Sequence, residues 1–228
     1  MQHRLASALA VLALTACNNA IIVELQTGEQ TFDLSAAALG LPPELRDPTD
    51  PTRIGSVPCP TGFCPTTTAV PVECNASSVC DPSAISVSVP VGDVIDFDAL
   101  LQSAGTLLRL VDGIEIESVT YDVSPNSLTM NLPPVTVLWG PATATETSAG
   151  LLPIGTIPAI AAATPVNGSM DIDASGAAAL GDYIVDSSRQ VRFFARTSVD
   201  LNPGDPYPDG MAHIVVNVRV RAIGRIVN

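Results

Sequence analysis

The chain has 228 residues, of which 46% are hydrophobic and only 4% aromatic, and this length is enough for one large domain or two small ones with a buried core. All ten basic residues are arginines, which excludes enzymes that form a Schiff base on a lysine or use one as a general base. The net charge of −13 excludes nucleic acid as a partner, because phosphate binding depends on clustered basic side chains.

The first element in chain order is an apolar run from Leu5 to Ala16, which follows Arg4. This pattern predicts an export signal over residues 1–16. A membrane-spanning helix needs about 20 apolar residues. The run is shorter than that, and it is followed by asparagine rather than by a basic cluster. We therefore expect residues 1–16 to direct export and to be removed.

Leu14, Thr15, Ala16 and Cys17 resemble the lipobox of bacterial lipoproteins, Leu-(Ala/Ser/Thr)-(Gly/Ala)-Cys, at all four positions. The resemblance implies that Cys17 carries a diacylglyceryl group, that cleavage precedes it, and that the new N-terminus is acylated, for example with palmitate. Two or three acyl chains anchor a protein stably in a membrane. Asn18 stands where inner-membrane retention signals of some bacteria carry Asp, so the expected location is the outer membrane. An ordinary signal peptide with an incidental cysteine is the alternative.

The middle of the chain is rich in proline and threonine between residues 42 and 71, and no apolar periodicity survives there. Such a composition predicts loops. We expect a tether over residues 17–30, an irregular module over residues 31–84 and a regular domain over residues 85–228.

Four cysteines fall within the predicted irregular module: Cys59, Cys64, Cys74 and Cys80. Because their number is even and the predicted compartment is oxidising, we expect two disulfides. Adjacent, nested and interleaved pairings all remain open. A four-thiolate zinc site is an alternative, although the C-x₂-C spacing that is usual for such sites is absent.

From residue 84 onward, apolar and polar residues alternate in segments 84–91, 127–132, 169–174 and 213–223, as in half-buried antiparallel strands. Within residues 113–123 the apolar parity changes near Ser118, which predicts a β-bulge or a strand break. Residues 175–186 are the one predicted helix, with Ser175 as its N-cap.

These elements predict a mainly β fold, an antiparallel β-sandwich or partly open barrel with one short helix, preceded by the disulfide-bearing loop module. The order of YDVSPNSLTMNLPPVTVLWGP, IGTIPAI and VDLNPGDPYPDG is similar to that of the LEA14-like, desiccation-related β-sandwich proteins. This resemblance implies a sandwich for the C-terminal part.

Two pairs of acidic residues are spaced as in glycosidases: Asp96 with Asp98, and Asp171 with Asp173. Residues two apart on a strand face the same side at about 7 Å, which suits paired carboxylates. A surface carbohydrate-active hydrolase is therefore one alternative function, and a solvated strand face is the simpler interpretation. His213 is the one histidine after the signal, and strand parity places it on the solvated face. The chain has no G-x-S-x-G, H-E-x-x-H or P-loop motif.

The turn-rich loop DLNPGDPYPDG carries Asp200, Asp205 and Asp209, whose oxygens are the ligands that calcium prefers. A calcium-dependent adhesion module is therefore a second alternative function. The same residues also favour an ordinary turn without metal.

Two predicted strands carry four arginines: Arg192, Arg196, Arg219 and Arg221. If the strands were neighbours, the four guanidinium groups could bind an anionic envelope glycan or a carboxylate-rich protein. Cross-strand pairing with Glu115 and Glu117 is the alternative. We expect, in sum, a non-enzymatic, lipid-anchored binding or structural protein of the bacterial envelope, without a cofactor.

Overall fold

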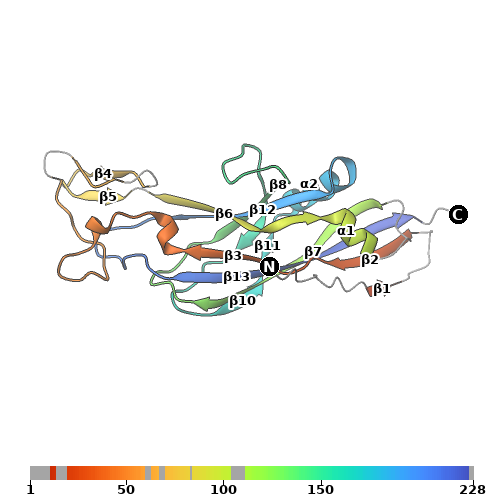
Figure 1. The fold of residues 1–228 in the computed structure, drawn as a ribbon, viewed down its shortest axis with the longest axis horizontal. Coiled ribbons are helices and arrows are strands. Elements are labelled where there is room, and N and C mark those ends of the chain that lie inside the picture. The colour runs from red at the N-terminus through yellow and green to blue at the C-terminus, as the bar shows by residue number, and fades with distance from the viewer. Residues whose placement is uncertain are drawn as a thin grey trace, which may run out of the picture.

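The computed structural model describes residues 11–13, 20–59, 63–66, 70–82, 84–103 and 111–225. They form two β-sheets that face each other, and a short hairpin at one end of an elongated molecule (Figure 1). All strand pairs within the sheets are antiparallel. The predicted fold class, mainly β with antiparallel sheets and few helices, is confirmed.

The first sheet has six strands in the order β1-β2-β13-β7-β10, and β3 also pairs with β13. Their bounds are β1 (Val11–Ala13), β2 (Ala20–Gln26), β3 (Gln30–Ser35), β7 (Val111–Asn126), β10 (Val166–Ser169) and β13 (Met211–Arg225). Strands β2 and β3 lie along one edge of β13, opposite residues 219–225 and 211–216 respectively. The edge of the long C-terminal strand is therefore covered by two N-terminal strands.

The second sheet has five strands in the order β11-β9-β8-β12-β6. Their bounds are β6 (Ile85–Asp96), β8 (Val135–Pro141), β9 (Leu152–Ile157), β11 (Asp171–Ile172) and β12 (Gln190–Val199). A third, two-stranded sheet pairs β4 (Val72–Cys74) with β5 (Cys80–Pro82).

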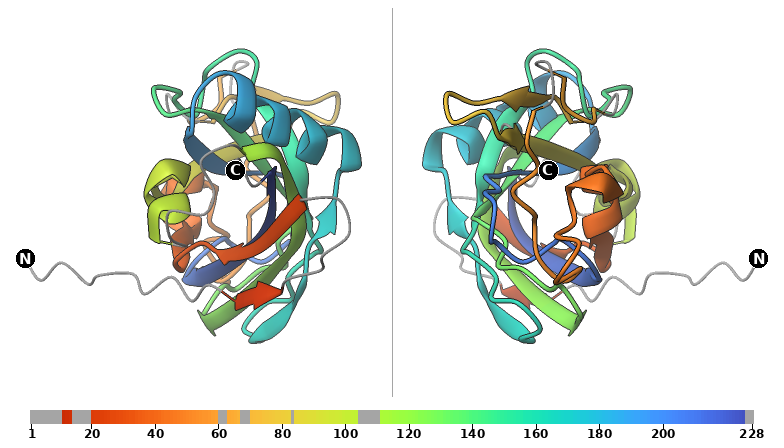
Figure 2. Two further views of the ribbon diagram at one scale, coloured as in Figure 1. Left: turned by 90° about the vertical axis from the view of Figure 1, so that its right-hand side faces the viewer. Right: turned by 90° about the vertical axis from the view of Figure 1, so that its left-hand side faces the viewer.

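The main hydrophobic core lies between the two large sheets, which enclose it in the end-on views of Figure 2. Strand β13 contributes alternate residues to it, as its sequence pattern predicts: Ile214, Val216, Val218, Val220 and Ala222. Val137 of β8 and Phe193 of β12 belong to the same core from the opposite sheet. Burial of small branched side chains on facing sheets is the main stabilising contribution in such a sandwich.

Helix α2 (Ala174–Asp186) packs against β7 and β9, which belong to different sheets. Its N-cap is Asp173 and not the predicted Ser175, because the Asp173 carboxylate accepts a 2.7 Å hydrogen bond from Gly176 N. A second helix, α1 (Phe97–Ser103), was not predicted. Seven residues are too few to show a clear apolar period.

The change of parity near Ser118 marks a β-bulge, as predicted. Ser118 opposes Arg219 and Ile116 opposes Val220, so that Glu117 is the extra residue of β7. The segment 127–132 differs from its prediction. Its alternate residues are buried, but it forms no strand, and instead Leu132 makes an isolated bridge with Ile160.

The predicted domain boundaries are wrong at the N-terminal side. Residues 20–26 of the predicted tether form β2, and residues 30–35 of the predicted irregular module form β3. Both strands belong to the sandwich, although their partner β13 is nearly the whole chain away in sequence. A local apolar pattern of this length does not reveal so distant a partner.

The irregular part of the chain lies at one end of the molecule (Figure 1). It contains two 3₁₀ turns, Ala36–Leu39 and Pro43–Leu45, and the β4–β5 hairpin. We call residues 36–82 at this end the disulfide lobe. Ala20 pairs with Arg225, the last residue of β13, and lies at the opposite end of the molecule. In the described part of the chain, no helix is long and apolar enough to cross a membrane.

Candidate functional site

A second hydrophobic cluster joins the disulfide lobe to the end of the sandwich. It consists of Leu39, Leu45, Ile54, Val70, Val72, Cys80, Ile85, Met130, Val199, Leu201 and Tyr207. The backbone continues this contact, because Ile54 N donates to Asp205 O and Tyr207 N donates to Thr52 O, both at 2.8 Å. The lobe is therefore fastened to the loop that precedes β13.

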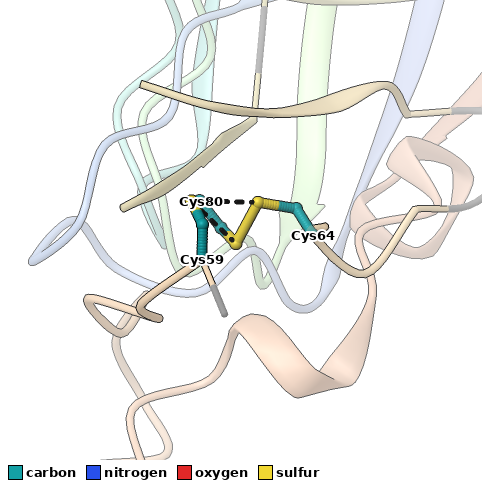
Figure 3. A group of neighbouring side chains, drawn as sticks. All are labelled: Cys59, Cys64 and Cys80. Carbon is teal, nitrogen blue, oxygen red and sulfur yellow. Dashed lines mark hydrogen bonds between the residues drawn. A yellow bond between two sulfur atoms is a disulfide. The ribbon is translucent and has the colours of Figure 1, made fainter. Parts of the chain in front are cut away.

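Two disulfides close the lobe, Cys59–Cys74 and Cys64–Cys80. Of the three pairings that the sequence leaves open, the structure has the interleaved one. The bridges lie against each other, with Cys59 Sγ 3.5 Å from Cys64 Sγ and 3.8 Å from Cys80 Sγ (Figure 3). Since all four thiols are paired, the alternative of a zinc site is not supported.

The sequence RDPTDPTR, residues 46–53, forms a tight loop in the lobe. Each Asp-Pro-Thr repeat makes an Asx turn, in which Asp47 accepts from Thr49 N at 2.7 Å and Asp50 accepts from Thr52 N at 3.1 Å. Hydrogen bonds from the threonine side chains and N–H groups hold the pKa of both carboxyl groups below the ordinary value. The base of the loop is closed by Asp47 N, which donates to Arg53 O at 2.9 Å.

Arg46 and Arg53 stand at the two ends of this loop, where Arg46 pairs with Ile54 across its base. They border a polar pocket of about 300 Å³ between the lobe and the sandwich. Its lining residues are Arg46, Thr52, Arg53, Thr129, Pro206, Tyr207 and Asp209. We take this pocket, the arginine pocket, as the candidate site.

The guanidinium of Arg46 is held on two sides. It lies over the ring of Tyr207, 3.6 Å from the centroid, and its Nη1 donates to Pro51 O at 2.8 Å. Tyr207 is buried, and its hydroxyl donates to Leu41 O at 2.9 Å. Burial raises the pKa of Tyr207, and the Arg46 charge opposes part of that rise.

Arg53 is held by Asp50 of its own loop and by Gly204 of the loop before β13. Its Nη1 donates to Gly204 O at 2.7 Å, and its Nε lies 3.4 Å from a carboxylate oxygen of Asp50. Its side chain is nevertheless 57% exposed, so the remaining N–H groups face solvent. A guanidinium has five N–H donors, and both arginines keep some of them for a ligand.

Thr129 and Asp209 form the sandwich side of the pocket. The Thr129 hydroxyl accepts from Asp209 N and donates to Tyr207 O, both at 2.8 Å. One carboxylate oxygen of Asp209 accepts from Gly210 N at 2.7 Å. The pocket therefore combines two cations, one carboxylate and three hydroxyl groups, an arrangement suited to holding a polar ligand.

The predicted arginine cluster does not form. Arg192 and Arg196 lie on β12 in the five-stranded sheet, whereas Arg219 and Arg221 lie on β13 in the six-stranded sheet. Neighbouring residues of both strands point into the shared core, so the two pairs of arginines face outward on opposite sides of the sandwich.

The alternative interpretation of these arginines, cross-strand pairing with Glu115 and Glu117, is correct for Arg221. Its guanidinium lies 3.2 Å from a carboxylate oxygen of Glu117 and 3.9 Å from one of Glu115. Arg196 instead donates to Glu146 O at 3.0 Å, and Arg219 is exposed. These residues belong to the surfaces of two sheets and form no common site.

The predicted carboxylate pairs have structural roles. Asp96 is the last residue of β6 and accepts from Ala99 N at 3.1 Å, whereas Asp98 lies in α1 and pairs with Arg189 at 2.7 Å. Asp173 caps α2 and Asp171 lies on β11. The strand geometry that would place Asp96 and Asp98 on one face is therefore absent.

The predicted calcium loop does not gather its three acidic residues. Asp205 accepts from Asn202 N at 2.8 Å within its own turn, and Asp209 belongs to the arginine pocket. Asp200 instead lines a separate polar pocket with Glu73 and other residues. Among the described residues, the one group of three or more potential ligands within 4.8 Å consists of cysteines that are in disulfides.

His213 lies on the outer face of its sheet, as predicted, and is about one-third exposed. Its Nδ1 is 2.7 Å from a carboxylate oxygen of Asp33, the residue opposite it on β3. Cys17, the predicted lipid attachment site, lies outside the described residues.

Arg46, Arg53 and Tyr207 were not predicted to form a site. The repeat that links the two arginines was a usable signal, since two Asp-Pro-Thr turns in tandem bring their flanking residues together. Tyr207 gave no signal, because its contact with Arg46 depends on the fold.

No protein-family model matches the chain, and no curated protein matches it. A solved structure from Desmodium yellow mottle tymovirus is similar over 100% of this chain and 94% of that chain, at 11% identity and a TM-score of 0.27. A likeness with so low a TM-score carries no argument about fold or function.

Proposed function

We propose that this protein is an exported bacterial lipoprotein, anchored in the outer membrane through Cys17, whose sandwich is a non-enzymatic binding module. The lipobox Leu14-Thr15-Ala16-Cys17 supports the anchor, and two disulfides are consistent with an oxidising compartment. The binding surface of this module is the arginine pocket.

The observation that carries the proposal is the position of the pocket relative to the start of β2. Ala20, three residues after Cys17, lies at the end of the molecule where β13 finishes. The arginine pocket lies at the other end, beside the start of β13. A strand of 15 residues spans about 50 Å, so the pocket would face away from the membrane.

Fractionation of wild-type protein and a Cys17→Ala variant in a bacterium that processes lipoproteins tests this function. Wild type is expected in the outer-membrane fraction, with a mass increased by acyl chains, because these chains provide the anchor. Cys17→Ala should lose the lipid mass and leave that fraction. Asn18→Asp is the matched control, which keeps the lipid and, in hosts that use this sorting rule, moves to the inner membrane.

If wild type carries no lipid mass and Cys17→Ala still fractionates with membranes, the anchor is wrong. A sugar-cleaving activity that depends on Asp96 or Asp171 would instead favour the hydrolase.

A further inference from the structure

We infer that the arginine pocket binds the carboxylate of an acidic saccharide, of the uronic acid class. This inference deepens the proposed binding function and rests on it. It follows from the charge of the lining, from how its cations are held, and from its free hydrogen-bond acceptors.

The charge of the lining suits a ligand with a single negative charge. Two guanidinium groups and the Asp209 carboxylate leave the lining residues with one net positive charge, while Asp50, outside the lining, offsets part of the Arg53 charge at 3.4 Å. The chain as a whole is at −13, so a carboxylate would be attracted by these local groups and not by the overall charge.

Both cations are fixed before a ligand arrives. Arg46 is stacked on the buried Tyr207 ring and bonded to Pro51 O, and Arg53 is bonded to Gly204 O. Fixing a long side chain in advance lowers the entropy cost of binding. Guanidinium groups also match the two oxygens of a carboxylate better than ammonium groups do.

The remaining polar groups favour a ligand that also has hydroxyl groups. The Thr52 hydroxyl donates its proton to Asp50, which leaves its lone pairs as acceptors. Of the two Asp209 carboxylate oxygens, one accepts from Gly210 N. The other can accept from a sugar hydroxyl. A volume of about 300 Å³ is at the lower end for small-molecule sites and suits one or two sugar units.

Binding of galacturonic acid and its trimer to the purified protein, kept in detergent when it carries lipid, tests the inference. Calorimetry or a nuclear magnetic resonance titration should detect both ligands, and added salt should weaken them. Arg53→Gln should lower the affinity by about tenfold or more, because it removes a charge-assisted hydrogen bond. Arg219→Gln is the matched control, since Arg219 is an exposed arginine on β13 that does not line the pocket, and this variant should bind like wild type.

If Arg53→Gln does not fold, Asp209→Asn provides the second test. It removes a repelling charge but keeps an oxygen acceptor, so galacturonate should bind severalfold more tightly at low salt while galactose is unaffected.

Three results would overturn the inference: no binding of either acidic sugar, equal binding of galactose, or equally tight binding of inorganic phosphate with the same dependence on Arg53. If any of these results is obtained with a protein that does carry lipid on Cys17, the proposed ligand is wrong and the proposed lipid anchor is retained. If the protein binds the acidic sugars but carries no lipid, the proposed anchor is wrong and the proposed ligand is retained.

Discussion

Four aspartates of this chain act as acceptors at turns and helix starts: Asp47, Asp50, Asp96 and Asp173. Hydrogen bonds from nearby side chains and N–H groups lower the pKa of each, because they favour the charged form. Their contribution to stability is therefore present above the ordinary aspartate pKa and is lost as the pH falls through the lowered values. Acidic residues that look like paired catalytic groups in the sequence serve here to define local structure.

The pKa of Tyr207 is shifted in the opposite direction, upward, and this leads to a prediction at high pH. Burial raises its pKa above the ordinary value of 10.0, with the Arg46 charge opposing the rise and Glu44 and Asp209 adding to it. Folding disfavours the ionised phenol, so this contribution to stability is complete below pH 10 and is lost as the pH rises further. The Tyr207→Phe variant should not show this loss of stability at high pH.

At neutral pH, Tyr207→Phe should lower the free energy of unfolding by about 1 kcal/mol, because Leu41 O loses its hydroxyl donor. Urea unfolding followed by circular dichroism, repeated between about pH 9 and 11, measures both effects. If wild type and variant lose stability in parallel over this range, the ionisation of Tyr207 is not coupled to folding.

Among the elements, α2 is placed by glycines that allow it to approach the sheets closely. A Cβ on Gly176 would overlap Pro153 O, and one on Gly181 would overlap Ile114 O. The helix is also tied to the core by Trp139, whose Nε1 donates to Gly176 O at 3.2 Å and whose ring lies 5.4 Å from that of Tyr183. Trp139 is the one tryptophan of the chain, so its fluorescence reports on this contact.

Gly181→Ala should therefore destabilise the protein, although alanine favours helices. The propensity gain is about 1 kcal/mol, whereas overpacking costs about 1–3 kcal/mol. The overlap with Ile114 O involves backbone that cannot move aside easily, so we expect a net loss and a red-shifted Trp139 emission. Gly113→Ala in β7 is the control, because no atom lies within 4 Å of the added methyl group, and it should change neither quantity. An unshifted emission with unchanged stability would show that α2 has room to move.

The elements that could be predicted are those whose own residues carry the signal. Strand β13 and α2 show long alternating or helical patterns, and the bulge at Glu117 follows from a change of parity. Strands β2 and β3 could not be placed, because their role depends on pairing with the other end of the chain. The arginine pocket was missed for the same reason, since Arg46 meets Tyr207 only in the folded lobe.

On the scale of the whole molecule, the two largest hydrophobic clusters of the described residues are held in place by different structures. The sandwich core lies between two large sheets, whereas the lobe's side of the second cluster is held by two 3₁₀ turns, the short β4–β5 pair and two disulfides. Small structures with little core of their own depend on such cross-links. The arginine pocket borders the lobe cluster through Tyr207, so we expect its geometry to depend on the disulfides that hold the lobe.

Reduction of the disulfides should therefore loosen the lobe while the sandwich stays folded. Closing a loop of 15 or 16 residues contributes about 3 kcal/mol in the chain-entropy model, so each bridge matters for a unit of this size. Hydrogen exchange should show lost protection at Ile54 and Cys80 in reduced protein, with protection of β13 and Trp139 fluorescence retained. Loss of all protection at once would mean that lobe and sandwich form one cooperative unit.

The interleaved pairing itself can be checked on the oxidised protein. Cleavage after Phe63, after Glu73 and before Val79 separates the four cysteines into four peptides. Mass spectrometry should then find Cys59 joined to Cys74 and Cys64 joined to Cys80. The pairing matters for the lobe, because Val70, Val72 and Cys80 belong to one hydrophobic cluster with Leu45 and Ile54, which flank the loop of Arg46 and Arg53. A nested pairing, with Cys59 joined to Cys80, would contradict this structure of the lobe.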